Sequence, residues 1–428
     1  MKSQIFNIWT GKSEAAALLQ SFAQPFDPAP PPLPPLVYHM PELHAELLCA
    51  VGSLLGLPSV KPTAKIPHPH IFSSNTPLSS DAWGFEAFWP FIQEICETEA
   101  ALYEHLQLRR TEIEEIRDSV RPFILPIPGL EALSQVGSLS LIQNGLSGSY
   151  FLSDENKIPR FVIKPLDEDI GALNNPKGYA SPFAHSLLTD MPLYRSCFRE
   201  VAAFQIAEQT GVSSIIPRTA FAILEREEFY DISQQISPKE LMRFGELMGH
   251  GDQEKLCSVQ EFVQESKTLF EALQDLQQHG LSDEDIERLF DQTDFEDANI
   301  LLWMTGDPDG HSNNFLVTPK RNDAIGHQMF GLRKIDNGFA FPEQNGDLYN
   351  GVATLPNARH PLSQKAIEKI QDIDPDDLAN TLQRHGLESS IEAMRERIET
   401  LQRITLENPS MSIKKINKRL SSLHEKVA

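Results

Sequence analysis

The chain has 428 residues, of which 40% are hydrophobic, and a formal net charge of −23. This length and composition are enough for two or three compact domains with a large buried core. The negative charge disfavours nonspecific binding to nucleic acid, because such binding depends on Lys and Arg side chains that neutralise phosphates. It also disfavours broad adhesion to anionic lipid. We therefore expect no nucleic-acid partner.

Four cysteines, at positions 49, 96, 197 and 257, lack the spacing of a disulfide framework or of a metal site. They favour reduced thiols in a cytosol-like compartment. The N-terminal residues lack the apolar core of a secretory signal, and no apolar run reaches the ~18 residues of a membrane-spanning helix. We expect a cytoplasmic protein, with peripheral membrane contact as an open alternative.

We expect a proline-containing segment over residues 1–60 and a helical N-terminal region over residues 61–130. The run over residues 26–36 is too rich in proline for a helix and predicts extended polyproline, either as a linker or as a ligand for proline-recognition domains. Apolar residues then recur at nearly helical period and predict one long helix from about 90 to 121. Pro122 and the prolines that follow it end this helix, because proline cannot continue its hydrogen-bond ladder.

Residues 138–266 change to short strands around one helix, and helical periodicity dominates again later. The predicted strands cover residues 139–142, 150–152, 161–164, 220–224 and 259–263, and the predicted helix covers 195–209. We expect residues 267–365 to form the core of a helical lobe and residues 366–428 to form a C-terminal helical region. Its basic stretch, residues 413–420, is either a solvated helix end or a contact for a membrane or an acidic partner.

Three features of the β-rich region suit a nucleotide. Ser147, Gly148 and Ser149 form a small-residue turn whose backbone amides could approach phosphate oxygens, although ordinary hairpins have such turns too. Lys164 ends an apolar strand and needs an anionic partner if it points inward, which Glu200 could supply from the following helix. Phe262 and Val263 could offer backbone groups to an adenine ring.

The helical lobe contains the run Asp307-Pro-Asp-Gly-His-Ser-Asn-Asn314, followed by Asp336-Asn-Gly338. Phosphoryl transfer needs a positioned nucleophile and a metal ion held against the phosphates. Asp309 would orient the acceptor hydroxyl and take its proton, and Asn314 would reach the metal. Asp336 would be the principal ligand of Mg²⁺ (or Mn²⁺), because carboxylate oxygen suits a hard cation.

The order of these motifs resembles the phosphatidylinositol 3- and 4-kinase superfamily, and within it the type II phosphatidylinositol 4-kinases and the plant gamma group. The resemblance covers roughly residues 138–365, including Asn174-Asn-Pro-Lys-Gly178 and Asp309-x-His311-x-x-Asn314. It implies an α+β, bilobed kinase-like fold with a β-rich N-lobe and a helical C-lobe, here preceded by the helical N-terminal region. It also implies ATP, a divalent metal and the roles given above to Lys164, Asp309, Asn314 and Asp336.

Two departures from the family pattern stand out. Members usually carry Arg directly after the catalytic Asp, whereas this chain has Gly310, which we expect to lower activity or to loosen the loop. The animal type II enzymes also share an acylated cysteine-rich segment, whereas residues 178–197 here contain a single cysteine. Lipid anchoring of that kind is therefore not expected.

The acceptor stays open between phosphatidylinositol and a protein hydroxyl, since the plant gamma relatives are regarded as protein kinases. The segment over residues 350–360 lies where acceptors are read in this fold and offers only Arg359 and His360 as cationic groups.

A third hypothesis is a catalytically silent kinase-like binding module, motivated by Gly310. A eukaryotic-type kinase with an unrelated N-terminal region would also suit a bacterial effector delivered into a host.

Overall fold

The computed structural model describes residues 110–172, 174–177, 193–230, 254–320, 329–346 and 348–423. The proline run and most of the helix predicted over residues 90–121 lie outside this part of the chain. The described end of that helix is α5 (Arg110–Val120), which stops before Pro122 as predicted. A short 3-10 turn, η3 (Arg121–Phe123), follows and contains that proline.

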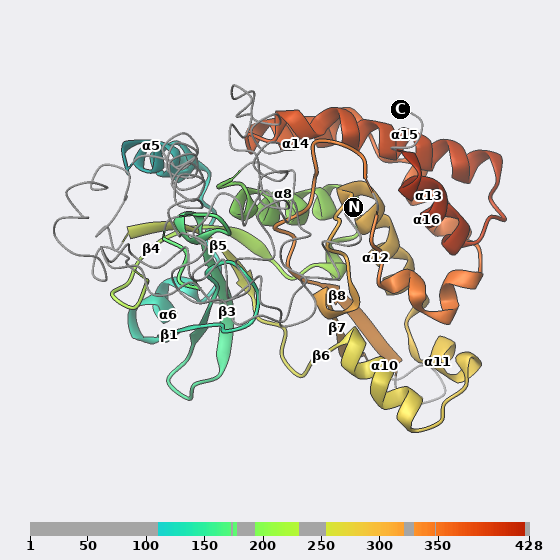
Figure 1. The fold of residues 1–428 in the computed structure, drawn as a ribbon, viewed down its shortest axis with the longest axis horizontal. Helices are drawn as coiled ribbons and strands as arrows, with labels where there is room; N and C mark the ends of the chain where they lie inside the picture. The colour runs from blue at the N-terminus through green and yellow to red at the C-terminus, as the bar shows by residue number, and fades with distance from the viewer. Residues whose placement is uncertain are drawn as a thin grey trace, which may run out of the picture.

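A five-stranded antiparallel sheet forms the first lobe, with strand order β1-β2-β3-β5-β4 (Figure 1). Each of the five predicted strands overlaps a strand of this sheet, but the one predicted over residues 259–263 runs from Glu254 to Glu261. Apolar residues at alternate positions turn one side of each strand toward a core. In β3, for example, Phe161 and Ile163 are both buried. The strands are β1 (Ser138–Leu141), β2 (Tyr150–Ser153), β3 (Pro159–Pro165), β4 (Thr219–Glu225) and β5 (Glu254–Glu261).

Two helices pack against this sheet. Leu130 of α6 (Leu130–Val136) is buried with Tyr150, Leu152 and other residues of the sheet. α8 (Ser196–Gln209) confirms the predicted helix and buries residues all around its surface. Its residues Phe198 and Val201 pack with β4 and β5, whereas its later small residues join the core of the helical lobe. α8 therefore belongs to both cores and fixes the position of one lobe relative to the other.

The second lobe is built around the buried helix α12 (Gln292–Thr305) and a small sheet of order β6-β7-β8. The strands of this sheet are β6 (Lys267–Thr268), β7 (Phe315–Lys320) and β8 (Met329–Lys334). The surrounding helices are α10 (Leu269–Gln278), α11 (Asp283–Leu289), α13 (Gln364–Gln371), α14 (Pro375–Arg384), α15 (Ile391–Glu407) and α16 (Ile413–Ser421). Figure 1 shows the larger sheet on one side, the helices on the other and α8 between them. The expected α+β fold with a sheet-containing lobe and a helical lobe is confirmed.

None of the helices in the described ranges is both long and apolar enough to cross a bilayer. Of the four cysteines, Cys197 in α8 and Cys257 in β5 lie within those ranges, and both are buried free thiols. Residues 178–192, the larger part of the segment considered for lipid anchoring, lie outside them.

His385 lies where α8 and α14 meet. The residue is 7% exposed, and its Nε2 is 3.0 Å from Gln205 Oε1. Burial, assisted by the neighbouring Arg384, lowers the pKa of His385 to about 4. In the unfolded chain this histidine takes up a proton near pH 6.5, whereas in the folded chain it does so only near pH 4. The stability that comes from a neutral His385 is therefore fully present above pH 6.5 and is lost as the pH falls toward 4.

We expect His385→Gln to remove this pH dependence, because Gln can still contact Gln205 but does not titrate. Between pH 7.5 and 4.5, the free energy of unfolding of the wild type should fall by up to about 3 kcal/mol more than that of the variant. Urea unfolding at a series of pH values measures this difference, with the exposed His279→Gln as the matched control. Parallel pH profiles for wild type and His385→Gln would contradict the prediction.

Candidate active site

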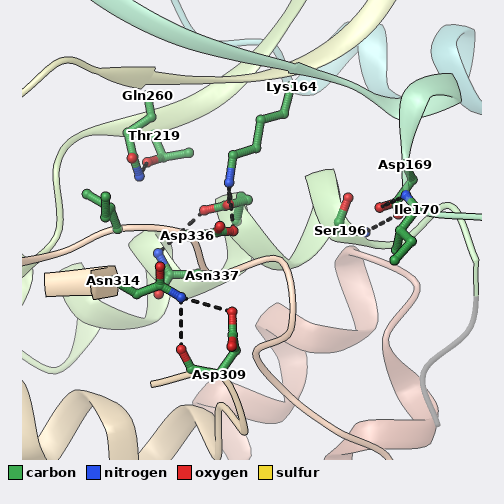
Figure 2. Close-up of polar contacts among 12 residues, drawn as sticks. Lys164, Asp169, Ile170, Ser196, Thr219, Gln260, Asp309, Asn314, Asp336 and Asn337 are labelled. Carbon is green, nitrogen blue, oxygen red and sulfur yellow. Dashed lines mark hydrogen bonds and ion pairs between the residues drawn. The ribbon is translucent and has the colours of Figure 1, made fainter. Parts of the chain in front are cut away.

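Lys164, Glu200 and Asp336 form an ion-pair triad between the two lobes, and Figure 2 shows Lys164 pointing toward Asp336. The Nζ atom of Lys164, at the end of β3, contacts Glu200 Oε1 on α8 and lies 2.9 Å from Asp336 Oδ1, just after β8. Asn337 Nδ2 lies 3.4 Å from the other carboxylate oxygen of Glu200. The structure therefore brings together the predicted partners Lys164 and Glu200 and adds Asp336 to them.

The charges of the triad support one another. Burial alone would lower the pKa of Lys164, but Asp336 and Glu200 outweigh burial and raise it, so Lys164 stays protonated. In the same way, burial would raise the pKa of Asp336, but Lys164 outweighs it and holds that pKa at about 2. Both groups are therefore charged at neutral pH.

Asp336 has a left-handed backbone, with φ 58°. This conformation is uncommon for residues other than Gly and is several-fold enriched for Asp. The buried Lys334 accounts for it, because its Nζ donates hydrogen bonds to the carbonyl oxygens of Ile335 and Asp336, both at 2.8 Å. The same Nζ lies 2.9 Å from Asp307 Oδ2. Lys334 thus ties the loop at Asp307 to the turn at Asp336.

The loop from Asp307 to Asn314 holds its own polar side chains in place. Asn314 Nδ2 donates to both the carbonyl oxygen and Oδ2 of Asp309, each at 2.9 Å, as Figure 2 shows. Asp307 Oδ1 accepts from the Asp309 backbone N–H at 2.8 Å. Burial, followed by the carboxylates of Asp336 and Asp307, raises the pKa of Asp309 to about 6. Asp309 is therefore an ionised base at neutral pH.

A cation would find oxygen ligands on two of these residues. Because the Asn314 amide nitrogen is engaged by Asp309, its Oδ1 is the side-chain atom left for a metal ion, and Asp336 offers a carboxylate. The described residues contain no group of three or more His, Cys, Asp and Glu side chains that could hold a metal. Mg²⁺ does not need one, since it commonly binds one or two carboxylates together with water and substrate phosphates.

Three of these residues were missed by sequence reasoning. Lys334 lies at the end of an apolar strand, as Lys164 does, so the same pattern could have singled it out. Asp307 is 0% exposed and pairs with Lys334, although its position in an Asp-Pro-Asp turn predicts only a capping role. His311 was part of the motif without a role, and its Nε2 lies 3.4 Å from Asp309 Oδ1.

The turn predicted to bind phosphate has a different arrangement at Gly148. The Gly148 N–H donates to the Glu168 carbonyl at 2.7 Å, so in this structure it does not point to a ligand. A Cβ atom at position 148 would lie 2.6 Å from Glu168 Cβ, which explains the glycine by close packing. Glu168 is fixed in turn by Tyr150 Oη and Lys255 Nζ, both at 2.6 Å. Ser147 and Ser149 flank this anchored position.

The prediction for Phe262 and Val263 needs one correction. Both residues follow β5, which ends at Glu261, rather than lying inside a strand. The Phe262 N–H donates to the Arg160 carbonyl at 2.8 Å and is therefore not available to an adenine ring. The Val263 carbonyl accepts from Ser266 Oγ at 3.0 Å. The Phe262 carbonyl and the Val263 N–H remain as the backbone groups that could meet a base.

The two cations predicted to read an acceptor are already paired in the structure. Arg359, at the end of η9 (Pro356–Arg359), contacts Asp283, and His360 Nε2 lies 3.0 Å from Glu287 Oε1. Both carboxylates come from α11. The segment over residues 350–360 therefore presents less free positive charge than its sequence predicts.

Gly310 is held by a close approach of the chain. Its carbonyl accepts from the Gly351 N–H at 2.7 Å. A Cβ atom at position 310 would overlap the Tyr349 carbonyl oxygen and would lie 2.8 Å from Leu302 Cδ2. This packing leaves no room for the Arg of the family pattern. It also fastens the loop that we expected Gly310 to loosen.

We expect Gly310→Ala to displace the loop rather than to stiffen it. The overlap should lower the free energy of unfolding by roughly 1–3 kcal/mol. A shift of Asp309 by about 1 Å should lower the rate of any reaction at this site by about 10²-fold. Thermal unfolding and turnover measure the two effects, with Gly346→Ala as control because a Cβ atom there meets nothing within 4 Å. Wild-type behaviour of Gly310→Ala would show that the loop tolerates a side chain.

Comparison with known proteins relates the chain to phosphatidylinositol 4-kinases. It is 29% identical over 241 residues to phosphatidylinositol 4-kinase gamma 7 of Arabidopsis thaliana, a match covering 55% of this chain and 33% of that protein. It is 26% identical over 261 residues to phosphatidylinositol 4-kinase type 2-alpha of Xenopus laevis, covering 54% of each. The resemblance predicted from the motifs is confirmed. The matches span a third to about half of the length of these relatives.

The chain was also compared with protein-family models and with solved structures. No protein-family model matches the chain. Among solved structures, the Golgi casein kinase has a TM-score of 0.37 at 12% sequence identity, covering 81% of this chain and 92% of that one.

Proposed function

We propose that this chain is an ATP- and Mg²⁺-dependent kinase that transfers a phosphoryl group to phosphatidylinositol. The observation that carries this proposal is the contact of Lys164 with both Glu200 and Asp336. Asp309 and Asn314 lie in the same region, as the close-up in Figure 2 shows. Four segments far apart in the sequence meet at this point. The similarity to phosphatidylinositol 4-kinases supports the same conclusion.

Each residue of the site has a role in the proposed reaction. Lys164, held by Glu200, binds phosphate oxygens of ATP, and backbone groups near Val263 meet the adenine. Asp309 orients the acceptor hydroxyl and takes its proton while the new bond from oxygen to the γ-phosphorus forms, the bridging bond breaks and ADP leaves. Asn314 and Asp336 would hold Mg²⁺, which would neutralise negative charge on the phosphates.

A protein hydroxyl is the second candidate acceptor. The observation that favours it is the pairing of Arg359 with Asp283 and of His360 with Glu287, because the headgroup phosphate of a phosphoinositide would have to compete with both carboxylates. A protein acceptor carries no headgroup phosphate and does not need these two cations. In this alternative the roles of Lys164, Asp309, Asn314 and Asp336 stay the same.

Transfer of radiolabel from γ-labelled ATP tests the proposal. Phosphatidylinositol vesicles and a generic protein acceptor are supplied separately, each with Asp336→Asn as the inactive control. Label in the lipid supports the first acceptor, and label only in the protein supports the second. If neither acceptor is labelled but ATP binds, the chain is a kinase-like binding module. Absence of both labelling and ATP binding would refute the kinase proposal.

Peripheral membrane contact is proposed through α16. This helix buries Ile413, Ile416 and Leu420 in the core of the helical lobe, so its apolar side is not available for insertion into a bilayer. The exposed side carries the cations Lys414, Lys415, Lys418 and Arg419. Contact would therefore be electrostatic and sensitive to salt.

We expect the double variant Lys414→Glu/Lys415→Glu to bind vesicles rich in phosphatidylserine at least ~10-fold more weakly, since each basic residue near such a surface contributes about 1 kcal/mol. Cosedimentation at low and high salt measures the effect. The control is the double variant Lys157→Glu/Lys365→Glu, which changes the net charge by the same amount at two exposed lysines outside α16. Equal losses in both double variants would mean that net charge, rather than α16, governs binding.

A further inference from the structure

The run Asn174–Lys177 has no role in the site described so far, although it belongs to the motifs that resemble kinases. The structure fastens this run to the turn between β1 and β2. Asn175, which is 2% exposed, donates from Nδ2 to the carbonyl oxygens of Leu146 at 2.9 Å and of Asp169 at 3.1 Å. Its Oδ1 accepts from the Lys177 N–H at 2.9 Å. The backbone of Lys177 is thereby placed beside the turn.

The side chain of Lys177 reaches over the same turn. Its Nζ donates to the Asn144 carbonyl at 2.6 Å, and a Cβ atom at Gly145 would lie 3.8 Å from that Nζ. Gly145 has φ +82°, a left-handed conformation that favours glycine. Within the described ranges no carboxylate lies at ion-pair distance from Lys177, in contrast to Lys164, Lys255 and Lys334.

The hydrogen bond from Lys177 Nζ to the Asn144 carbonyl places this lysine beside the turn that was predicted to bind phosphate. Burial lowers the pKa of Lys177 to about 8, Asp336 opposes this effect, and the positive charge of Lys164 adds to it. An anion bound beside Lys177 would stabilise its protonated form.

The charge balance of the site favours a further cation in addition to Lys164 and the proposed Mg²⁺. Lys164 is shared between the carboxylates of Glu200 and Asp336, so this triad carries a net charge of about −1 before any ligand binds. The polyphosphate of a nucleotide is itself strongly negative. In addition, the amide of Gly148, expected to meet phosphate, is engaged with Glu168.

We propose that Lys177 is a further phosphate-binding residue of this site, which donates to the polyphosphate of the nucleotide from beside the β1–β2 turn. The inference rests on the proposed function, because it assigns a contact to the same ATP. On nucleotide binding, the Lys177 ammonium exchanges the Asn144 carbonyl for a charged phosphate oxygen. A charge-assisted hydrogen bond of this kind contributes about 1.5–3 kcal/mol, or roughly 10- to 100-fold in affinity.

Calorimetric titration of the full chain with Mg-ATP and with adenosine tests the inference. We expect Lys177→Met to weaken Mg-ATP binding by at least ~10-fold while adenosine binds as in the wild type, because adenosine lacks phosphates. Lys177→Arg should retain most of the affinity for Mg-ATP. The matched control is Lys157→Met, which alters an exposed lysine of the same lobe, in the β2–β3 connection.

The outcomes separate this inference from the proposed function. Unchanged Mg-ATP affinity in Lys177→Met would overturn the inference and leave the kinase proposal standing. An equal loss of affinity for Mg-ATP and adenosine would also overturn it, since that result indicates a structural role for Lys177. If the wild type binds no Mg-ATP at all, both the kinase proposal and the inference fall.

Discussion

Asp309→Asn is expected to lower kcat for phosphoryl transfer by roughly 10²- to 10⁴-fold, the usual contribution of a positioned general base. Asn has nearly the same shape as Asp and can still accept a hydrogen bond from Asn314 Nδ2, but it cannot take the proton of the acceptor hydroxyl. The affinity for Mg-ATP should therefore change by no more than about twofold. Steady-state turnover and calorimetric titration measure the two quantities.

The control for this variant is Asp372→Asn, which removes one negative charge from an exposed position. It should have the same kcat as the wild type.

The pH profile gives a second test of Asp309, because the pKa of Asp309 is raised to about 6 and only the ionised carboxylate acts as a base. Activity should thus fall as the pH drops below about 6. Retention of more than a tenth of wild-type kcat in Asp309→Asn would exclude Asp309 as the base.

Lys164→Met is expected to lower kcat/KM by roughly 10²- to 10³-fold, in the range found when one preorganised donor is removed from a transition state. The substitution removes the ammonium that would hold phosphate. It also leaves Glu200 and Asp336 as neighbouring negative charges without their shared cation. The melting temperature should therefore fall together with activity.

A double variant separates these two effects. In Lys164→Met/Glu200→Gln, the more deeply buried of the two carboxylates becomes neutral, so the melting temperature should recover while activity stays low. Glu200→Gln alone should keep part of the activity, because Lys164 retains its contact with Asp336. Recovery of activity in the double variant would mean that Lys164 acts only by balancing charge and that it binds no phosphate.

The secondary structure around the site could be predicted closely because its pattern is local. Alternating apolar residues gave the five strands of the larger sheet, and the helix predicted over residues 195–209 is α8. The prediction was wrong at the end of β5, because the strand ends at Glu261 and the Phe262 N–H makes one more hydrogen bond to β3, at Arg160. Pairing depends on the neighbouring strand, which a single apolar run does not reveal.

Candidate site residues could be named wherever a polar group interrupts an apolar element, as Lys164 does, or wherever a motif orders Asp and Asn, as at Asp309 and Asn314. Lys334 shows the same pattern as Lys164, but other residues that fix their neighbours gave no such signal. Asp307 occupies an ordinary turn, and Glu168 is one acid among several. Each becomes identifiable only through a partner distant in the chain, as with Lys255 and Glu168, which are 87 residues apart.

The sequence by itself determined the kinds of chemistry present in this protein: one lysine on an apolar strand, two acids and an amide at the spacing of a phosphoryl-transfer loop, and a glycine where relatives carry Arg. Only the tertiary structure decided what each group faces. It placed Lys164 between two carboxylates and joined the Gly148 N–H to the Glu168 carbonyl by a hydrogen bond. It also packed Gly310 against Tyr349, so that a side chain there would overlap its neighbour. The physical reason is that hydrogen bonds, ion pairs and close contacts depend on distance in space, which residue type and spacing along the chain do not fix.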